Sequence, residues 1–202
     1  MEFNDPKLKE YIDQLVDEKL SEKTKEFSAQ FDTIQNTLAT LKAAPQTTEK
    51  VTMLVTSFEL DKIMPAFIIA NGAASFGMDV TLFFTLWGIN ALKDKSVYSG
   101  KTIKEKLITM MLPSTPQTTT ISRLNMLGVG TEMMKMMMKE NNIETLPDLI
   151  DLSVEMGAKL IACQMTMGMM GITTEEIRKD VEFGGVATYI EEASDATITL
   201  TF

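Results

Sequence analysis

The sequence predicts an α/β domain of the doubly wound class, a parallel sheet with helices on both faces. The run Val51–Thr56 is continuous, apolar and rich in β-branched residues, which is typical of a central parallel strand covered on both faces. An alanine- and isoleucine-rich helix follows over Glu59–Phe76, and a second buried strand follows over Val80–Thr85. A strand, a helix and a strand in this order predict a right-handed crossover in a parallel sheet.

The remaining elements are predicted from shorter patterns, and together they leave room for five parallel strands within residues 48–202. In chain order we expect a loop opening at Leu86–Gly88, a helix over Gly100–Met111, an extended loop over Leu112–Thr120, a methionine-rich helix after Gly130, a helix over Leu146–Met156, a strand over Lys159–Cys163 with a helix starting near Gln164, a short helix from Thr173 to Lys179, a turn at Gly184 and Gly185, a helix over Val186–Ala193 and a terminal strand over Thr197–Phe202.

Residues 1–47 are predicted to form a separate N-terminal amphipathic helix, joined to the α/β domain by a linker over Ala44–Thr47. The segment is highly charged and contains no glycine, and Asp5-Pro6 favours a helix start. Its apolar residues form two sets that are out of phase, so we expect a long helix with a register shift. The first set is Leu8, Tyr11, Ile12, Leu15, Val16 and Leu20, and the second, with coiled-coil spacing, is Phe27, Phe31, Ile34, Leu38 and Leu41. The helix packs on its own domain or pairs with another copy, and the densely charged opposite face favours pairing.

Composition restricts the functions that the chain can have. With 28 acidic and 19 basic residues its formal charge is −9, which disfavours nucleic acid or an anionic membrane as a partner. There is no histidine, so zinc sites and Ser-His-Asp or Cys-His catalysis are not expected. No glycine-rich phosphate-binding motif follows the first strand, and we expect no metal and no cofactor.

The expected location is the cytoplasm. A single cysteine excludes an internal disulfide, which favours a reducing compartment. The N-terminus is polar and charged and shows no signal peptide. The apolar stretch over Ile63–Leu92 is interrupted by Pro65, Asn71, Gly72, Gly77 and Asp79, so membrane spanning is not expected.

Methionine is unusually frequent, with 17 residues in the chain. Met133, Met134, Met136, Met137 and Met138 lie in one predicted helix, and Met165, Met167, Met169 and Met170 follow the cysteine. Thioethers beside a thiolate could bind Cu(I), but methionine also fills irregular cores and interfaces, which is its commoner role.

Cys163 is the residue around which the chain can be organised. It lies at the end of a predicted buried strand, where parallel sheets bind their ligands, and a helix is expected to start next to it. The positive end of that helix would favour the thiolate. The alternative is that Cys163 is a buried and inert packing residue.

The sequence around Cys163 resembles a known family. The run ACQMTMGMMGI starting at Ala162, the EEI that follows it, and VEFGGVATYIEEA with a final short strand are similar to the DsrE/DsrF-like sulfur-trafficking family, in its peroxiredoxin-like branch. Residues 122–128 and the methionine-rich helix after Gly130 also match, and the resemblance covers Lys50 to Phe202.

The resemblance implies a flavodoxin-like, DsrE-like three-layer fold, assembly as a homo-oligomer and a cysteine, here Cys163, that carries sulfane sulfur as a persulfide. The chain departs from the branch by having Thr166 and Gly168 in the turn after Cys163, where relatives often have serine and aspartate. It also has no second cysteine, so a resolving-cysteine peroxidase mechanism within one subunit is excluded.

The leading hypothesis is a sulfur carrier or sulfurtransferase with Cys163 as the catalytic residue. Its partners would be sulfur donor and acceptor proteins or small sulfane-sulfur compounds. Arg123 could bind an anionic donor or form a surface ion pair, while Asn125 and Gln164 could bind the transferred sulfur or be satisfied buried amides. Ser57 and Trp87 are expected to line the crevice. The alternatives are a non-catalytic oligomeric module that docks partners, and a small-molecule or flavin binder.

Overall fold

The computed structural model describes residues 6–43, 49–123 and 125–202. The chain divides into two compact units, Met1–Thr47 and Thr48–Phe202, which are described separately. The predicted linker over Ala44–Thr47 lies outside the described residues.

The first unit is a single long helix, α1 (Pro6–Ala43), which is continuous over its 38 residues. Its side chains are described at Glu10 and over residues 14–37, and all of these are exposed. The exposed apolar residues are Leu15, Val16, Leu20, Phe27, Phe31 and Ile34. The side chains of Leu8, Tyr11, Ile12, Leu38 and Leu41 lie outside the described set, so the two apolar sets are seen only in part.

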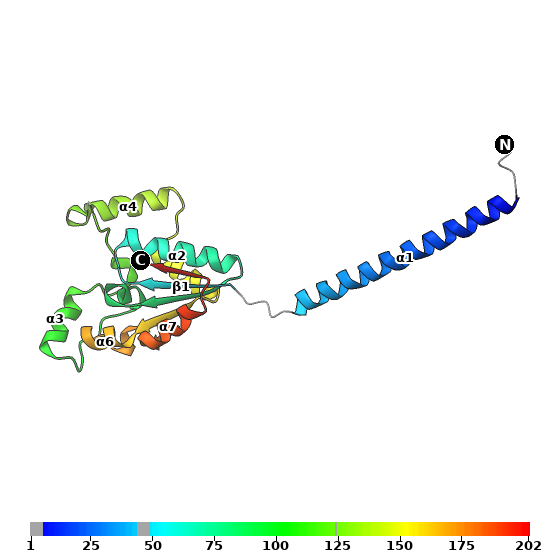
Figure 1. Cartoon of the computed structure of the whole chain (residues 1–202). Coiled ribbons are helices and arrows are strands. Elements are labelled where there is room, and N and C mark those ends of the chain that lie inside the picture. The colour runs from blue at the N-terminus through cyan, green and yellow to red at the C-terminus, as the bar shows by residue number, and fades with distance from the viewer. Residues whose placement is uncertain (1–5, 44–48, 124) are drawn as a thin grey trace. The chain divides into compact units, whose positions relative to one another are not determined.

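The second unit is built on a five-stranded parallel sheet, which confirms the predicted fold class (Figure 1). The spatial order of the strands is β4-β3-β2-β1-β5. The strands are β1 (Lys50–Val55), β2 (Asp79–Phe84), β3 (Lys159–Cys163), β4 (Glu182–Gly184) and β5 (Ile198–Thr201). Because every neighbouring pair is parallel, the carboxyl ends of all strands lie at one edge of the sheet.

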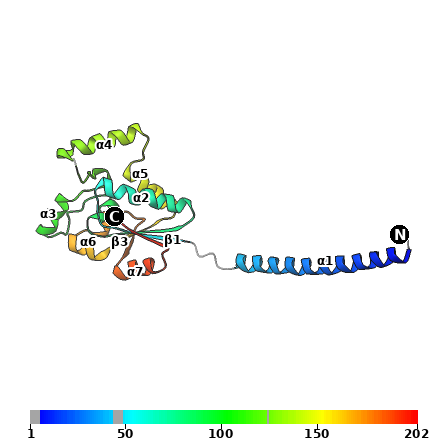
Figure 2. The same cartoon turned by 45° about the horizontal axis from the view of Figure 1, so that its top comes forward.

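Helices cover both faces of the sheet and make a three-layer structure. The two views in Figures 1 and 2 agree that α2 and α4 lie on one side of the sheet and α6 and α7 on the other. The α-helices of this unit are α2 (Leu60–Ser75), α3 (Ile103–Met111), α4 (Val129–Glu140), α5 (Leu146–Glu155), α6 (Gln164–Met170) and α7 (Val186–Ser194), and the 3-10 helices are η1 (Leu86–Leu92), η2 (Pro116–Thr118), η3 (Met126–Gly128) and η4 (Thr174–Glu176). Among the described residues, no helix combines the length and the apolar character needed to cross a bilayer.

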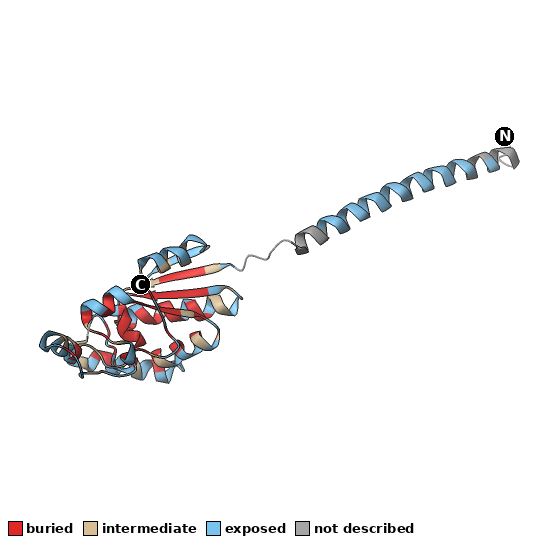
Figure 3. Cartoon of the chain, turned by 90° about the horizontal axis from the view of Figure 1, so that it is seen from below, coloured by how far each residue is buried: buried red, intermediate tan, exposed pale blue. Residues whose placement is uncertain are grey.

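The face of the sheet under α2 and α5 carries the larger hydrophobic core. Alternate residues of β1, β2 and β3 point to it, including Met53, Leu82 and Leu160, which are all buried. Phe67 of α2 stacks on Phe84 of β2 with ring centroids 5.9 Å apart. Figure 3 shows buried residues concentrated in the central strands and on the inner sides of the helices of this unit.

The face under α7 has a smaller core and more polar groups. Phe83, Ile161 and Cys163 form its buried cluster, with Tyr189 of α7 packed against Phe83 at a centroid distance of 5.3 Å. Further along α7, the Glu192 carboxylate forms ion pairs with two lysines, each at the first position of a strand. It lies 2.5 Å from Lys50 Nζ and 2.8 Å from Lys159 Nζ.

Three predicted elements differ from the structure. Gly184 does not form a free turn with Gly185, because it is the last residue of β4 and pairs with Cys163. A Cβ atom at Gly184 would lie 3.0 Å from side-chain atoms of Ile161 and Thr188, so glycine lets β4 approach its neighbours closely.

The helix predicted from Thr173 to Lys179 is only the short η4. Glu176 is fully buried and pairs with Lys101 at 2.6 Å, and Ile177 then forms an isolated bridge with Lys93. These contacts draw the chain into an extended path after Glu176. The predicted loop at Leu86–Gly88 is likewise the start of the 3-10 helix η1.

Candidate functional site

Cys163 joins the end of β3 to the start of α6. It is the last residue of β3 and the cap residue of α6, and strand alternation places its side chain on the α7 face together with Ile161. The side chain is 2% exposed and packs among Phe83 and Ile161.

Two threonine hydroxyls lie together beside this thiol. Thr85 follows β2 directly, and Thr166 lies in the first turn of α6. Their Oγ1 atoms are 2.8 Å apart, and the backbone N–H of Leu86 donates to Thr166 Oγ1 at 3.2 Å. Since Thr166 Oγ1 accepts this hydrogen bond, its own hydroxyl hydrogen is available to another acceptor.

These groups favour the thiolate form of Cys163. Burial raises the pKa of the Cys163 thiol, but hydrogen bonding from the Thr166 backbone amide and the hydroxyls of Thr166 and Thr85 acts in the opposite direction, with help from the Met165 amide. The net result is a pKa below the ordinary value for cysteine. Cys163 is therefore both buried, as the packing alternative predicted, and set in polar surroundings that favour the anion.

The segment after β2 is held in a strained and closely packed conformation. Leu86 has a φ of 49°, a left-handed value that is uncommon for a non-glycine residue. Gly88 follows it, and a Cβ atom there would lie 2.4 Å from the carbonyl oxygen of Val55. The Gly88 N–H donates to the Thr56 carbonyl at 3.1 Å, so this segment is fixed on the end of β1 and holds Thr85 beside Thr166.

The structure separates the predicted sulfur-binding residues. Gln164 is the first residue of α6 and is exposed, so it is not a buried amide. Asn125 is half-buried and its side-chain oxygen accepts a hydrogen bond from Thr131 Oγ1 at 2.7 Å, which organises the turn before α4. Arg123 is exposed in the same turn. Among the described residues, neither Arg123 nor Asn125 is hydrogen bonded to Cys163.

Ser57 and Trp87, which were expected to line the crevice, are both outside the polar surroundings of the thiol. Ser57 is half-buried at the end of β1, two strands away from β3. Trp87 is 57% exposed on η1.

Sequence reasoning missed Thr85 as a site residue. The signal was available, because Thr85 ends a predicted strand and the carboxyl ends of parallel strands meet at one edge. The strand order, which places β2 next to β3, could not be predicted from the sequence.

The methionines do not form one cluster around the thiol. Met133, Met134, Met136 and Met137 are exposed on α4, which Figures 1 and 2 place on the other side of the sheet from α6. On α6, Met165 and Met169 are exposed, whereas Met167 and Met170 pack into the core.

Comparison with known proteins gives a family match over the α/β unit. Residues 47–201 match the model of the DsrE/DsrF/DrsH-like family. The chain is 40% identical over 154 residues to the uncharacterized protein YrkE of Bacillus subtilis, covering 76% of this chain and 96% of YrkE.

A second relative has a described role. The chain is 30% identical over 154 residues to the sulfur carrier protein DsrE2 of Allochromatium vinosum, covering 75% of this chain and 97% of DsrE2. Among solved structures, the YchN protein of E. coli matches with a TM-score of 0.47 and 11% identity, covering 76% of this chain and 99% of YchN.

Proposed function

The chain belongs to the DsrE/DsrF/DrsH-like family, and on that premise we propose that it is a sulfur carrier or sulfurtransferase in which Cys163 holds sulfane sulfur as a persulfide. The observation that carries this proposal is the polar setting of the only thiol, which lowers its pKa although it is buried. A thiol that served packing alone would not need this arrangement. Family membership favours this function over the partner-docking alternative.

The proposed transfer needs no oxidant. The Cys163 thiolate attacks the outer sulfur of a donor persulfide, a new sulfur–sulfur bond forms, and the donor leaves as a thiolate. In the second step an acceptor thiolate attacks the outer sulfur of the Cys163 persulfide, and the Cys163 thiolate is released. Electrons and charge balance in each step, since the donor persulfide is left as a thiolate and the acceptor thiolate becomes a persulfide.

The buried sulfur requires a local opening before it can react. The α6 helix has only seven residues, and its first two side chains, Gln164 and Met165, are exposed. We place the opening at these two side chains, because their movement can expose Cys163 while the amides of Met165 and Thr166 stay beside the thiolate.

The test is uptake of sulfur by the folded protein. The full chain is incubated with inorganic polysulfide, desalted and weighed by mass spectrometry, and the wild type is expected to gain sulfur that a reducing thiol then removes. Cys163→Ala is the matched control and should gain none, because the chain has no other cysteine. Equal uptake by both proteins, or uptake by the wild type only after denaturation, would contradict the proposal.

We also propose that α1 pairs copies of the chain as a coiled coil. Support comes from the apolar Phe27, Phe31 and Ile34, which are exposed on a continuous helix. Sedimentation of the full chain should show an assembly that Phe31→Glu weakens, and unchanged sedimentation would reject pairing through α1.

A single cysteine cannot form a disulfide within the chain, which suits a reducing compartment, and we therefore propose the cytoplasm as the location. Cell fractionation checks this placement, and recovery of the protein outside the cytoplasmic fraction would reject it.

A further inference from the structure

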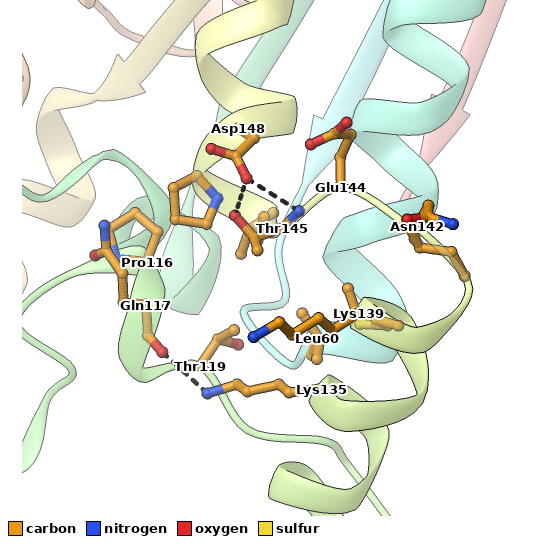
Figure 4. Close-up of a pocket in the computed structure, with 14 residues that line it drawn as sticks. Leu60, Pro116, Gln117, Thr119, Lys135, Lys139, Asn142, Glu144, Thr145 and Asp148 are labelled. Atoms are coloured by element: carbon orange, nitrogen blue, oxygen red, sulfur yellow. Dashed lines mark hydrogen bonds between the residues drawn. The ribbon is translucent and has the colours of Figure 1, made fainter.

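A half-open cavity of about 630 Å³ lies away from Cys163, between η2, the amino end of α2, α4 and the start of α5 (Figure 4). Its volume is within the range of small-molecule sites in proteins. None of its lining residues takes part in the thiol site described above.

The floor of the cavity is apolar and belongs to the core. Leu60, Met138 and Leu146 line it, and all three are buried members of the main hydrophobic cluster. Pro116 and Pro147 add apolar surface at the side. A floor made of side chains that are already packed from below provides surface for an apolar ligand without rearrangement.

Hydrogen bonds hold the walls in place. Lys135 Nζ donates to the Gln117 carbonyl at 3.1 Å, which ties α4 to η2. The Leu60 N–H donates to the Thr120 carbonyl at 2.9 Å, which ties α2 to the segment after η2. The cavity is therefore formed before any ligand binds.

Charge is distributed unevenly around the cavity. Figure 4 shows the Lys139 amine reaching across Leu60 toward Thr119, and among the described residues no carboxylate lies within ion-pair distance of it. Asp148 and Glu144 lie on the α5 side. Asp148 accepts hydrogen bonds from the backbone N–H of Thr145 at 3.3 Å and from its hydroxyl at 2.5 Å, so its carboxylate is held at the start of α5 and not over Leu60.

We propose that this cavity binds a small amphipathic anion, an unbranched alkyl chain with a single carboxylate or sulfonate head. The alkyl chain lies on Leu60, Met138 and Leu146, and the head is bound by the Lys139 ammonium. A cationic head over Leu60 would lie beside the Lys139 and Lys135 amines, whereas Glu144 and Asp148 lie on the α5 side of the cavity, so we expect a cation to bind more weakly.

The experiment is calorimetric titration of the full chain with hexanoate, octanoate and decanoate, with octanesulfonate and octylamine as head-group probes. We expect saturable binding at one site, with the affinity rising about fourfold for each methylene that is buried. Octanesulfonate should bind comparably to octanoate, and octylamine at least about tenfold more weakly.

Variants locate the site. Lys139→Gln should weaken octanoate binding about fivefold to tenfold, because it removes the ammonium that binds the carboxylate head. Lys139 is exposed on α4, so the substitution should leave the helix intact. Lys106→Gln, at an exposed position of α3 that does not line the cavity, is the matched control and should bind like the wild type. Absence of saturable octanoate and decanoate binding, octylamine binding as tight as octanoate, or undiminished binding by Lys139→Gln would each overturn the proposal. The last result would place the alkyl chain on another apolar surface.

Discussion

The two faces of the sheet differ in what stabilises them. The face under α2 and α5 is packed mainly with hydrocarbon, from Val51 on β1 to Ala162 on β3, with a hydrogen bond between the side chains of Ser153 and Asn71 as a polar contact between these helices. The face under α7 combines a small apolar cluster with the thiol at one end and the Glu192 ion pairs at the other. Since α7 contributes no fully buried residue, this second layer is thinly packed.

The comparison shows how one strand, β3, contributes both to the hydrophobic core and to the thiol site. In β3, Leu160 and Ala162 point into the main core, whereas Ile161 and Cys163 point to α7. The period of two in a strand allows stability and chemistry to be divided between neighbouring residues. Substitutions on the two faces should therefore have different sizes and different dependence on pH.

The largest effect is expected from Phe67→Ala on the hydrocarbon face. Phe67 is fully buried and stacks on Phe84, so its truncation should lower the free energy of unfolding by about 3–5 kcal/mol, with little change between acid and neutral pH. Urea denaturation measures this loss in the free energy of unfolding. Phe76→Ala, at a side chain 88% exposed at the end of the same helix, is the control and should stay within about 0.5 kcal/mol. A loss of similar size for both would remove the distinction between buried and exposed positions on α2.

The next effect is expected from Glu192→Gln on the α7 face. Burial raises the pKa of Glu192, but hydrogen bonds and charge from Lys159 and Lys50 outweigh it and bring the pKa to about 2, from 4.5. A lowered acid pKa stabilises the fold above the unfolded value, and this stabilisation is lost as the pH falls from about 4.5 through about 2. The variant should lose about 2 kcal/mol at about pH 7, after allowance for solvent screening, and approach the wild type near pH 2.

Glu191→Gln, at the exposed neighbouring residue, is the control for Glu192→Gln and should show no such pH-dependent difference. Urea denaturation across the acid range measures all three proteins. A constant gap between Glu192→Gln and the wild type down to pH 2 would show that the residue acts through packing and not through its charge.

The smallest and most specific of the three effects is expected on the acidity of the Cys163 thiol, from Thr166→Val beside it. Loss of the hydroxyl should raise the pKa of Cys163, because one of the groups that favour the thiolate is removed while the backbone amide remains. Ultraviolet absorbance of the thiolate, measured against Cys163→Ala, follows the titration. Alkylation at about pH 7 should slow by about threefold to tenfold.

Thr56→Val is the matched control for the thiol titration. It lies at the end of β1, where its hydroxyl donates to the Phe202 carbonyl at 2.8 Å, and it should leave the pKa of Cys163 unchanged. An identical titration midpoint in Thr166→Val and the wild type would mean that the amides alone set the acidity of the thiol.

The fold could be predicted from the sequence because its central strands are long apolar runs. Val51–Thr56 and Val80–Thr85 were placed within one residue of β1 and β2. The three-residue β4 escaped prediction, since it is too short for a pattern and ends in Gly184. The η4 segment was mistaken for a longer helix, because nothing local reveals that Glu176 is buried against Lys101.

The candidate site was predictable only in part. Cys163 could be identified as the single thiol at the end of a strand. Its partner Thr85 depends on strand order, and Thr166 depends on how α6 begins, neither of which is encoded in a local pattern. Asn125 matched a family-like run, but the structure uses its side chain to hold Thr131.

The two outer strands of the sheet are its shortest, with three residues in β4 and four in β5. An outer strand carries backbone N–H and C=O groups that can pair with a foreign strand, and short outer strands limit how many such groups are offered. Sheet-to-sheet extension between molecules is thereby discouraged. A chain that exposes many apolar side chains is therefore less prone to extend into fibres by strand pairing.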